Sequence, residues 1–194
     1  TRYRHVTGVQ TCALPISLAE IASLCRERGI AASRVTNRDL DRLGADMHTQ
    51  GVIAIASPYP YVEVADLLIP ARERGEAPFL LALDLLQDPQ NVGALLRTAE
   101  AAGVHGAILP ERGGVGVTPA VSRASAGAVE HLRIAQVTNL ARTLNDLKEQ
   151  NVWIVGVENH PAAQDYRAVD LNRPLALVLG GEGRFAQLYC EPGT

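Results

Sequence analysis

The chain has 194 residues, is 47% hydrophobic and carries a formal net charge of −3 at pH 7. Its length and apolar content allow one or two packed domains, and no apolar run approaches the length of a transmembrane helix. The charge balance excludes a uniformly basic nucleic-acid-binding surface, so any such site must be a local patch. The candidates for such a basic patch are Arg26, Arg28, Arg34, Arg38, Arg97 and Arg123. For any one of them, an ordinary solvated position on the surface is the commoner case.

Residues 1–16 do not read as a signal peptide, because their apolar stretch is short and interrupted. We interpret them as a non-native leader outside the fold. The cysteines Cys12, Cys25 and Cys190 are too few and too scattered for a disulfide framework or a zinc site. We therefore expect no metal and a reducing, cytoplasmic environment.

Residues 17–57 predict a small α/β domain. Ser17 and Glu20, three residues apart, are typical of a capping box at the start of a helix. A second short helix runs to Leu43, and the segment 48–56 predicts a turn and a buried strand.

Residues 58–77 predict a linker that ends in a short helix. Pro58 and Pro60 stiffen its beginning, because proline fixes φ and removes a backbone donor. Tyr59 and Tyr61 would stack on bases if they were exposed, although packing against the following domain is the more common fate of such residues.

Residues 79–109 predict a strand–turn–helix–strand unit. An apolar strand over 79–83 is followed by a helical pattern and by a helix-ending glycine, Gly103. The apolar face of that helix consists of Val92, Leu95, Leu96, Ala99 and Ala102. A second strand begins at 107–109, so the unit is the building block of a parallel sheet in an α/β fold.

The polar residues of this unit suggest a binding site. Asp88 or Asn91 can cap the helix by accepting a hydrogen bond from an unpaired backbone N–H. Gly93 and Arg97 are four residues apart and share a helix face. A glycine there would let a ligand approach, and the guanidinium of Arg97 would suit a phosphate or a ribose oxygen. The alternative is an ordinary capped helix with a solvated arginine.

The rest of the chain alternates helices and strands. Thr118 caps a short helix over 119–124 that begins with Pro119. The later elements are a strand over 131–136, a helix over 140–149 and strands over 152–157 and 175–179. The last strand leads into a glycine-rich turn, 180–183. A turn at the carboxyl end of a parallel strand is where α/β proteins bind ligands.

The segment 88–104, DPQNVGALLRTAEAAGV, resembles the first signature motif of the SpoU/TrmH family of RNA ribose 2′-O-methyltransferases, and LVLGGEG at 177–183 resembles the start of the second. The stretch 125–156 resembles the subgroup that methylates a guanosine of large-subunit ribosomal RNA. The likeness implies a SPOUT-type (α/β-knot) parallel sheet over 78–194 with helices on both faces. It also implies a partial L30-like RNA-binding domain over 17–57.

The resemblance further implies methyl transfer from S-adenosylmethionine (SAM) to a ribose 2′-hydroxyl of RNA, without a metal and in a homodimer. The implied catalytic residues are Arg97, Asn91 and Glu182. The donor would be bound by Leu179, Gly180, Gly181 and Gly183, and RNA by Arg97, Ser125 and His48. For His48, a hydrogen bond to a backbone group at a strand edge is the more common role.

Three departures from the family pattern occur near the end of the chain. Gly181 replaces a serine or threonine, Phe185 replaces a glycine, and the third motif, which completes the knot, does not appear before Thr194. We therefore expect this chain to keep the sheet, lack the knot and bind SAM weakly or not at all, so that it is inactive as it stands although its intact parent is an enzyme. Tight one-to-one SAM binding in calorimetry would refute this expectation. The alternatives are a transfer RNA substrate, a non-catalytic RNA-binding protein, and a Rossmann-type nucleotide enzyme. A Rossmann-type enzyme would have a glycine fingerprint after its first strand, and DPQNVG is not one.

Overall fold

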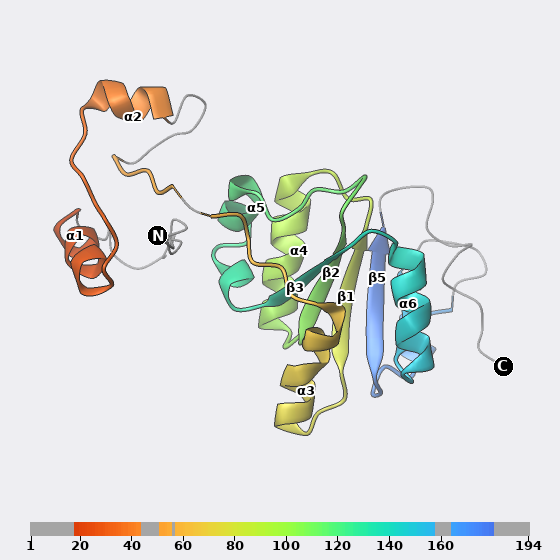
Figure 1. Ribbon diagram of the computed structural model, residues 1–194. Helices are drawn as coiled ribbons and strands as arrows, with labels where there is room; N and C mark the ends of the chain where they lie inside the picture. Colours follow the sequence, from red (N-terminus) through yellow and green to blue (C-terminus); the bar gives the residue numbers. More distant parts are fainter. Residues whose placement is uncertain (1–17, 44–50, 56, 158–163, 181–194) are drawn as a thin grey trace. The chain divides into compact units, whose positions relative to one another are not determined.

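The computed structural model describes residues 18–43, 51–55, 57–157 and 164–180 (Figure 1). The chain divides into two compact units, one ending at Pro58 and the other beginning at Tyr59. None of the helices in the described ranges is long and apolar enough to cross a membrane.

The first unit contains two helices with ordinary end signals. Helix α1 (Leu18–Glu27) is followed by Gly29 at a φ of 64°, and the N–H of Ile30 donates to the carbonyl of Cys25 (2.8 Å). Helix α2 (Asn37–Leu43) starts after Thr36. The Thr36 hydroxyl accepts from the N–H of Asp39, whose carboxylate in turn accepts from Thr36, so both ends of this reciprocal cap are present. The predicted Ser17 cap lies outside the described residues.

The strand predicted over 48–56 is not found where the structure describes that segment. Residues 51–55 are irregular, and the side chains of Val52 and Ile55 are 40% and 78% exposed. A strand is stabilised by pairing with a neighbour, and no strand occurs among the described residues of this unit. A short apolar run was therefore insufficient evidence for a strand. His48 lies outside the described residues.

The second unit is built on a five-stranded parallel sheet with the order β3-β2-β1-β5-β4. The strands are β1 (Phe79–Asp84), β2 (Gly106–Pro110), β3 (Arg133–Val137), β4 (Trp153–Val157) and β5 (Leu175–Gly180). Each lies within a few residues of the strand predicted for it. The predicted α/β parallel sheet is confirmed, whereas the prediction of a missing knot concerns residues after Gly180, which the structure does not describe.

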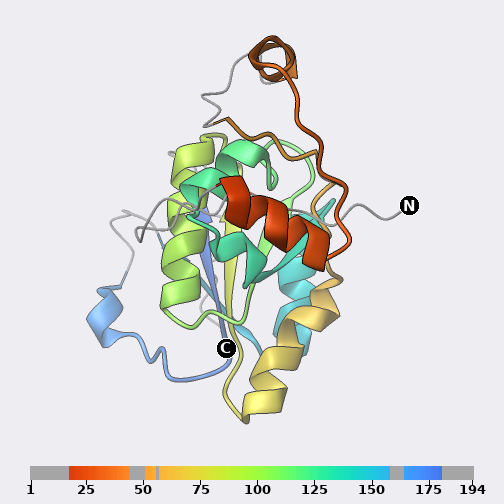
Figure 2. The same ribbon diagram turned by 90° about the vertical axis from the view of Figure 1, so that its left-hand side faces the viewer.

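Helices cover both faces of this sheet, as predicted (Figures 1 and 2). Helix α4 (Pro89–Ala101), helix α5 (Pro119–Ala124) and the short turn η2 (Ala128–Glu130) pack on the face that bears Leu81 and Leu83. Helix α6 (Leu140–Glu149) and the turn η1 (Val64–Leu68) pack on the face that bears Leu80 and Ala82. The alternation of β1 side chains between two apolar clusters explains why this central strand is hydrophobic on both sides.

Much of the segment predicted as a linker, 58–77, is packed into the second unit. The N–H of Val62 donates to the carbonyl of Ile134 (2.9 Å), and Val62 forms a bridge with Ala135 of β3. Leu67 of η1 is fully buried against the sheet, where a side chain on Gly106 would collide with it. Helix α3 (Ile69–Arg74) then ends at a glycine and leads into β1. This segment therefore supplies core contacts as well as connection.

Candidate active site

The carboxyl ends of all five strands point to one edge of the sheet, where β1 and β5 end side by side. Asp84 and Gly180 are paired in register there. From β1 the chain proceeds to β2 and β3 on one side, and it later returns through β4 to place β5 on the other side of β1. Such a switch in strand order opens a crevice outside the carboxyl ends, which is where open α/β sheets bind ligands.

The turn between β1 and α4 holds the amino end of the helix at this edge. Asp88 is the N-cap, and its carboxylate accepts from the N–H of Gln90 (3.0 Å). Leu85 has a φ of 52°, a left-handed conformation that is uncommon for a leucine. Asn91 is exposed, and its side chain makes no hydrogen bond within the part of the chain that is described. Of the two capping candidates, Asp88 is thus the cap, and no residue among those described occupies the amide of Asn91.

Arg97 lies further along α4, on the exposed side of the helix. At about 1.5 Å per residue, its backbone is about 12 Å from the first helical residue, Pro89. Because Cα–Cβ bonds in a helix tilt toward its amino end, the long side chain starts in the direction of the carboxyl edge. Its guanidinium forms no ion pair or hydrogen bond with any other described residue. Within the described part of the chain, all its donors are therefore open to a ligand.

The interpretation of Gly93 as an opening for a ligand was wrong. Gly93 is buried, and a Cβ atom at this position would contact the Cβ of Ala124 and lie 2.8 Å from the backbone nitrogen of Ser125. The absence of a side chain therefore serves the close crossing of α4 and α5. The helical period correctly placed Gly93 and Arg97 four residues apart on α4, but it could not show that α5 covers Gly93.

The contact between Ser125 and RNA stays a prediction, and the structure places this residue in the interior. Ser125 is fully buried, and its hydroxyl donates to the carbonyl of Ser122 (2.8 Å). The hydroxyl is therefore satisfied within the crossing of α4 and α5 and does not face the surface. Arg123, two residues earlier, is exposed and is a better placed candidate for the basic patch.

Half of the predicted donor-binding residues fall in the described part. Leu179 and Gly180 are partly buried at the end of β5, beside β1. Gly181, Glu182 and Gly183 lie outside the described residues, so the distance between Glu182 and Arg97 is not defined.

Asp84 is a further candidate for the site, and the sequence reasoning missed it. It is the last residue of β1 and is partly buried, and desolvation by this burial raises the pKa of its carboxyl above the ordinary value. Within the described ranges its carboxyl has no hydrogen-bond partner. The available signal was its position directly after an apolar strand, where a charged residue meets the ligand-binding edge.

Two family models match the chain. The model described as "SpoU rRNA Methylase family" matches residues 78–185, and the one described as "RNA 2'-O ribose methyltransferase substrate binding" matches residues 15–62. The chain belongs to the SpoU rRNA methylase family. The family domain thus contains the whole sheet, including the edge where β1 and β5 end side by side.

Curated relatives agree with this assignment. A Bacillus subtilis protein, YacO, assigned by its name to the TrmH family tRNA/rRNA methyltransferases, is 46% identical over 165 residues, which are 85% of this chain and 66% of the relative. A Staphylococcus aureus protein with a similar name is 40% identical over the same share of both chains. The chain therefore spans about two thirds of the length of these SpoU-family relatives.

Solved structures show the same fold. The AdoMet-bound rRNA methyltransferase from Sinorhizobium meliloti is 25% identical and superposes with a TM-score of 0.62, covering 87% of this chain and 62% of that chain. The SpoU methyltransferase AviRb from Streptomyces viridochromogenes, in complex with AdoMet, has a TM-score of 0.56 at 23% identity and covers 65% of this chain and 47% of that chain. The second likeness bears on the fold alone.

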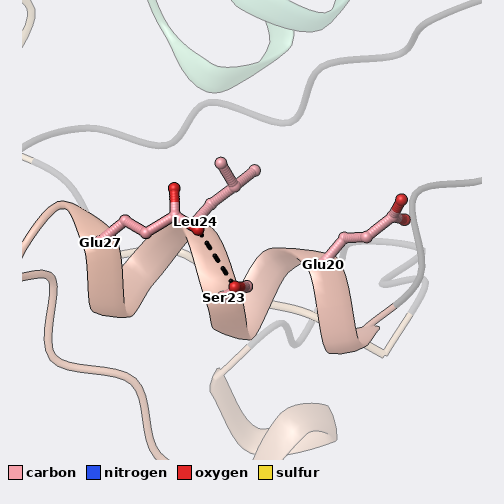
Figure 3. A pocket seen from close by; sticks show the side chains of 4 residues that line it. All are labelled: Glu20, Ser23, Leu24 and Glu27. Carbon is pink, nitrogen blue, oxygen red and sulfur yellow. Dashed lines mark hydrogen bonds between the residues drawn. The ribbon is translucent and has the colours of Figure 1, made fainter.

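The first unit of this SpoU-family chain has a surface hollow of a different character. Figure 3 shows Glu20, Leu24 and Glu27 along α1, with the hydroxyl of Ser23 hydrogen-bonded to the carboxylate of Glu27 (3.2 Å). Two carboxylates repel phosphate, so this hollow does not suit an RNA backbone. The exposed arginines of the same unit, which remain candidates for the basic patch, are Arg26, Arg28, Arg34 and Arg38.

Proposed function

We propose that this chain comprises the substrate-binding and methyl-transferring parts of a SAM-dependent RNA ribose 2′-O-methyltransferase, which acts on a guanosine of large-subunit ribosomal RNA as a homodimer. Membership of the SpoU family and the match of residues 15–62 to a substrate-binding domain support this proposal. The observation that carries it is the placement of Asn91 and Arg97, without intramolecular partners in the described ranges, on the helix that starts just after the carboxyl end of β1, where β5 also ends.

The described end of β5 fits the methyl donor. Leu179 offers a partly buried apolar side chain, and Gly180 has no side chain of its own to cover its backbone groups. When SAM is bound it supplies a methyl group activated by a sulfonium. Leu179 and Gly180, with Gly181 and Gly183 beyond them, would hold the donor, and the partly buried carboxylate of Asp84 beside Gly180 would favour its positive charge.

Arg97 and Asn91 would hold the acceptor ribose. A guanidinium keeps its proton at any pH relevant to proteins, so Arg97 is a poor base and a good electrostatic partner for a phosphate or for the oxygen of the 2′-hydroxyl. The amide of Asn91 would orient the same group, and Glu182 would orient Arg97. Holding the hydroxyl against the donor converts an encounter between two molecules into a reaction within one complex.

The test is the variant Arg97→Ala, compared with Arg142→Ala. Arg142 is an exposed arginine on α6, on the opposite face of the sheet, so it controls for loss of one positive charge. We expect Arg97→Ala to lower transfer of a tritiated methyl group to ribosomal RNA by at least about a hundredfold, as when a transition-state contact is removed. SAM binding, measured by calorimetry, should stay within about twofold. Retained methyl transfer in Arg97→Ala would remove this residue from the mechanism.

A transfer RNA substrate is the second candidate, because the name of the Bacillus subtilis relative covers both classes of RNA. Parallel assays with unmodified ribosomal RNA and transfer RNA separate the two. A chain that binds RNA but transfers no methyl group to either would instead support the non-catalytic alternative.

A further inference from the structure

Tyr61 lies near the start of the second unit, before η1, and contacts the loop that follows β2. Its hydroxyl accepts a hydrogen bond from the backbone N–H of Val117 (2.8 Å). Its own backbone position is fixed, because the N–H of the next residue, Val62, donates to Ile134 of β3. A residue anchored on the sheet therefore holds a loop that is 56 positions away in sequence.

The loop, residues 111–118, passes so close to Tyr61 that it requires a glycine. A Cβ atom at Gly116 would lie 2.7 Å from the Tyr61 hydroxyl and 3.3 Å from the side-chain nitrogen of Gln136. The φ of Gly116 is not in the left-handed region, so available space is what excludes a side chain here. The loop and the phenol are thus fitted to each other.

The same loop contacts the turn that leads into α4. The N–H of Val115 donates to the carbonyl of Leu86 (2.8 Å), and a Cβ atom at Gly113 would lie 2.6 Å from a methyl group of Leu85. Leu85 is the residue with the uncommon φ of 52°, which surrounding contacts must maintain. Downstream, Thr118 caps α5, and its hydroxyl accepts from the N–H of Val121.

We propose that Tyr61 is a positioning residue for the methyl-transfer reaction: through the loop 113–117 it holds the turn 85–88, and with it the amino end of the helix that bears Asn91 and Arg97. This inference rests on the proposed function for its effect on catalysis, whereas the hold on the loop is a property of the fold. Because Tyr61 touches neither donor nor acceptor in this scheme, it acts on the reaction only through these contacts.

Tyr59 provides a matched control. It is also partly buried, its ring lies edge-to-face with that of Tyr61 at 5.1 Å, and its hydroxyl donates to the carbonyl of Val129 (2.7 Å) instead of holding the loop. Burial raises the pKa of Tyr59, so this phenol stays a neutral donor. Tyr59→Phe and Tyr61→Phe thus remove the same atom from neighbouring rings, and only the second removes an acceptor from the loop.

The first measurement is hydrogen–deuterium exchange of the whole chain. We expect Tyr61→Phe to speed exchange of the amides of Val115 and Val117 by about fivefold, the size of effect that one net hydrogen bond produces. Tyr59→Phe should leave both amides at the wild-type rate. Unchanged exchange at these amides in Tyr61→Phe would overturn the proposal, and this outcome does not depend on whether the chain transfers methyl groups.

The second measurement is the methyl-transfer rate of the same variants. For Tyr61→Phe we expect kcat to fall several-fold while KM for SAM stays within about twofold and the melting temperature matches that of Tyr59→Phe. A purely structural role would instead lower both melting temperature and activity in parallel. Gly116→Ala, which pushes the loop away from the phenol, should reproduce the lower kcat. An unchanged kcat in both Tyr61→Phe and Gly116→Ala would overturn the catalytic part even if exchange increases.

Discussion

The crossing of α4 and α5 makes Gly93→Ala the sharpest test of the structure. The new Cβ atom would meet the Cβ of Ala124 and lie 2.8 Å from the Ser125 nitrogen and 2.9 Å from the Ala124 carbonyl carbon. Ordinary contacts between such atoms are about 3.5 to 4 Å, so the helices must separate by roughly an ångström. The obstructing atoms include backbone, which cannot rotate away.

Two opposing terms set the magnitude of this effect. Overpacking of a core costs about 1–3 kcal/mol, and the rigid backbone here places Gly93→Ala near the upper end. Replacing glycine by alanine inside a helix returns about 1 kcal/mol. We therefore expect a net loss of about 2 kcal/mol in the free energy of unfolding, or a melting temperature roughly 4–8 °C lower.

The assay is thermal unfolding followed by circular dichroism, with Ala124→Gly as the second member of a double-mutant cycle. Ala124→Gly removes one of the obstructing atoms but not the backbone of Ser125. The double variant should therefore recover part of the stability lost by Gly93→Ala, which appears as a favourable coupling energy. A Gly93→Ala protein as stable as the wild type, with no coupling to position 124, would refute the close crossing of α4 and α5.

Three further predictions concern other contacts. Asp84→Asn should stabilise the protein at neutral pH, because the folded state raises the pKa of this carboxyl and so resists its ionisation. In urea unfolding at different pH values, the gain in stability over wild type should vanish below the ordinary pKa of 3.8, where Asp84 is protonated in both the folded and the unfolded state. His105→Ala should lower the free energy of unfolding by about 2–3 kcal/mol, since the buried ring accepts from the N–H of Phe79 (3.0 Å) and contacts the carboxylate of Glu76 (2.9 Å). Glu76→Gln keeps an acceptor at a half-exposed position and should lower it by less than about 1 kcal/mol. Both are measured by chemical unfolding. Arg173→Met should alter the fluorescence emission of Trp153, the chain's one tryptophan, because the guanidinium lies 4.0 Å from the ring centroid. The free energy of unfolding should fall by no more than about 1 kcal/mol. An unchanged emission spectrum would count against this stacking.

The sequence predicted local structure well, because end signals and periodicity act over a few residues. The caps Asp88 and Thr118 are where polar residues precede apolar periodic runs, and the predicted helices 119–124 and 140–149 have the observed bounds. The five strands were identifiable as short apolar runs between helices. The prediction of a strand within 48–56 was wrong for the described residues 51–55. Whether a strand forms depends on pairing with a neighbouring strand, which an apolar pattern cannot guarantee.

The candidate site was less predictable, because its residues depend on contacts between distant segments. Nothing near Tyr61 in sequence indicates that its hydroxyl meets Val117. Likewise, the pairing of Asp84 with Gly180 follows from the return of β5 to the side of β1. Asp84 was therefore not a candidate from the sequence, whereas Gly180 was one because of its motif.

The corrected role of Gly93 strengthens the link between fold and proposed chemistry. A helix is stiff over one turn, and Arg97 lies about 6 Å further along the axis than Gly93. The contact of Gly93 with Ala124 and Ser125 therefore fixes the height and rotation of α4, and with them the position from which the guanidinium reaches the sheet edge. A shift of about an ångström at a reacting centre can cost a large factor in rate. Gly93→Ala should thus reduce methyl transfer at temperatures where the protein remains folded, and the double variant with Ala124→Gly should recover activity together with stability. Recovery of stability without activity would mean that the crossing holds the fold but does not set the position of Arg97.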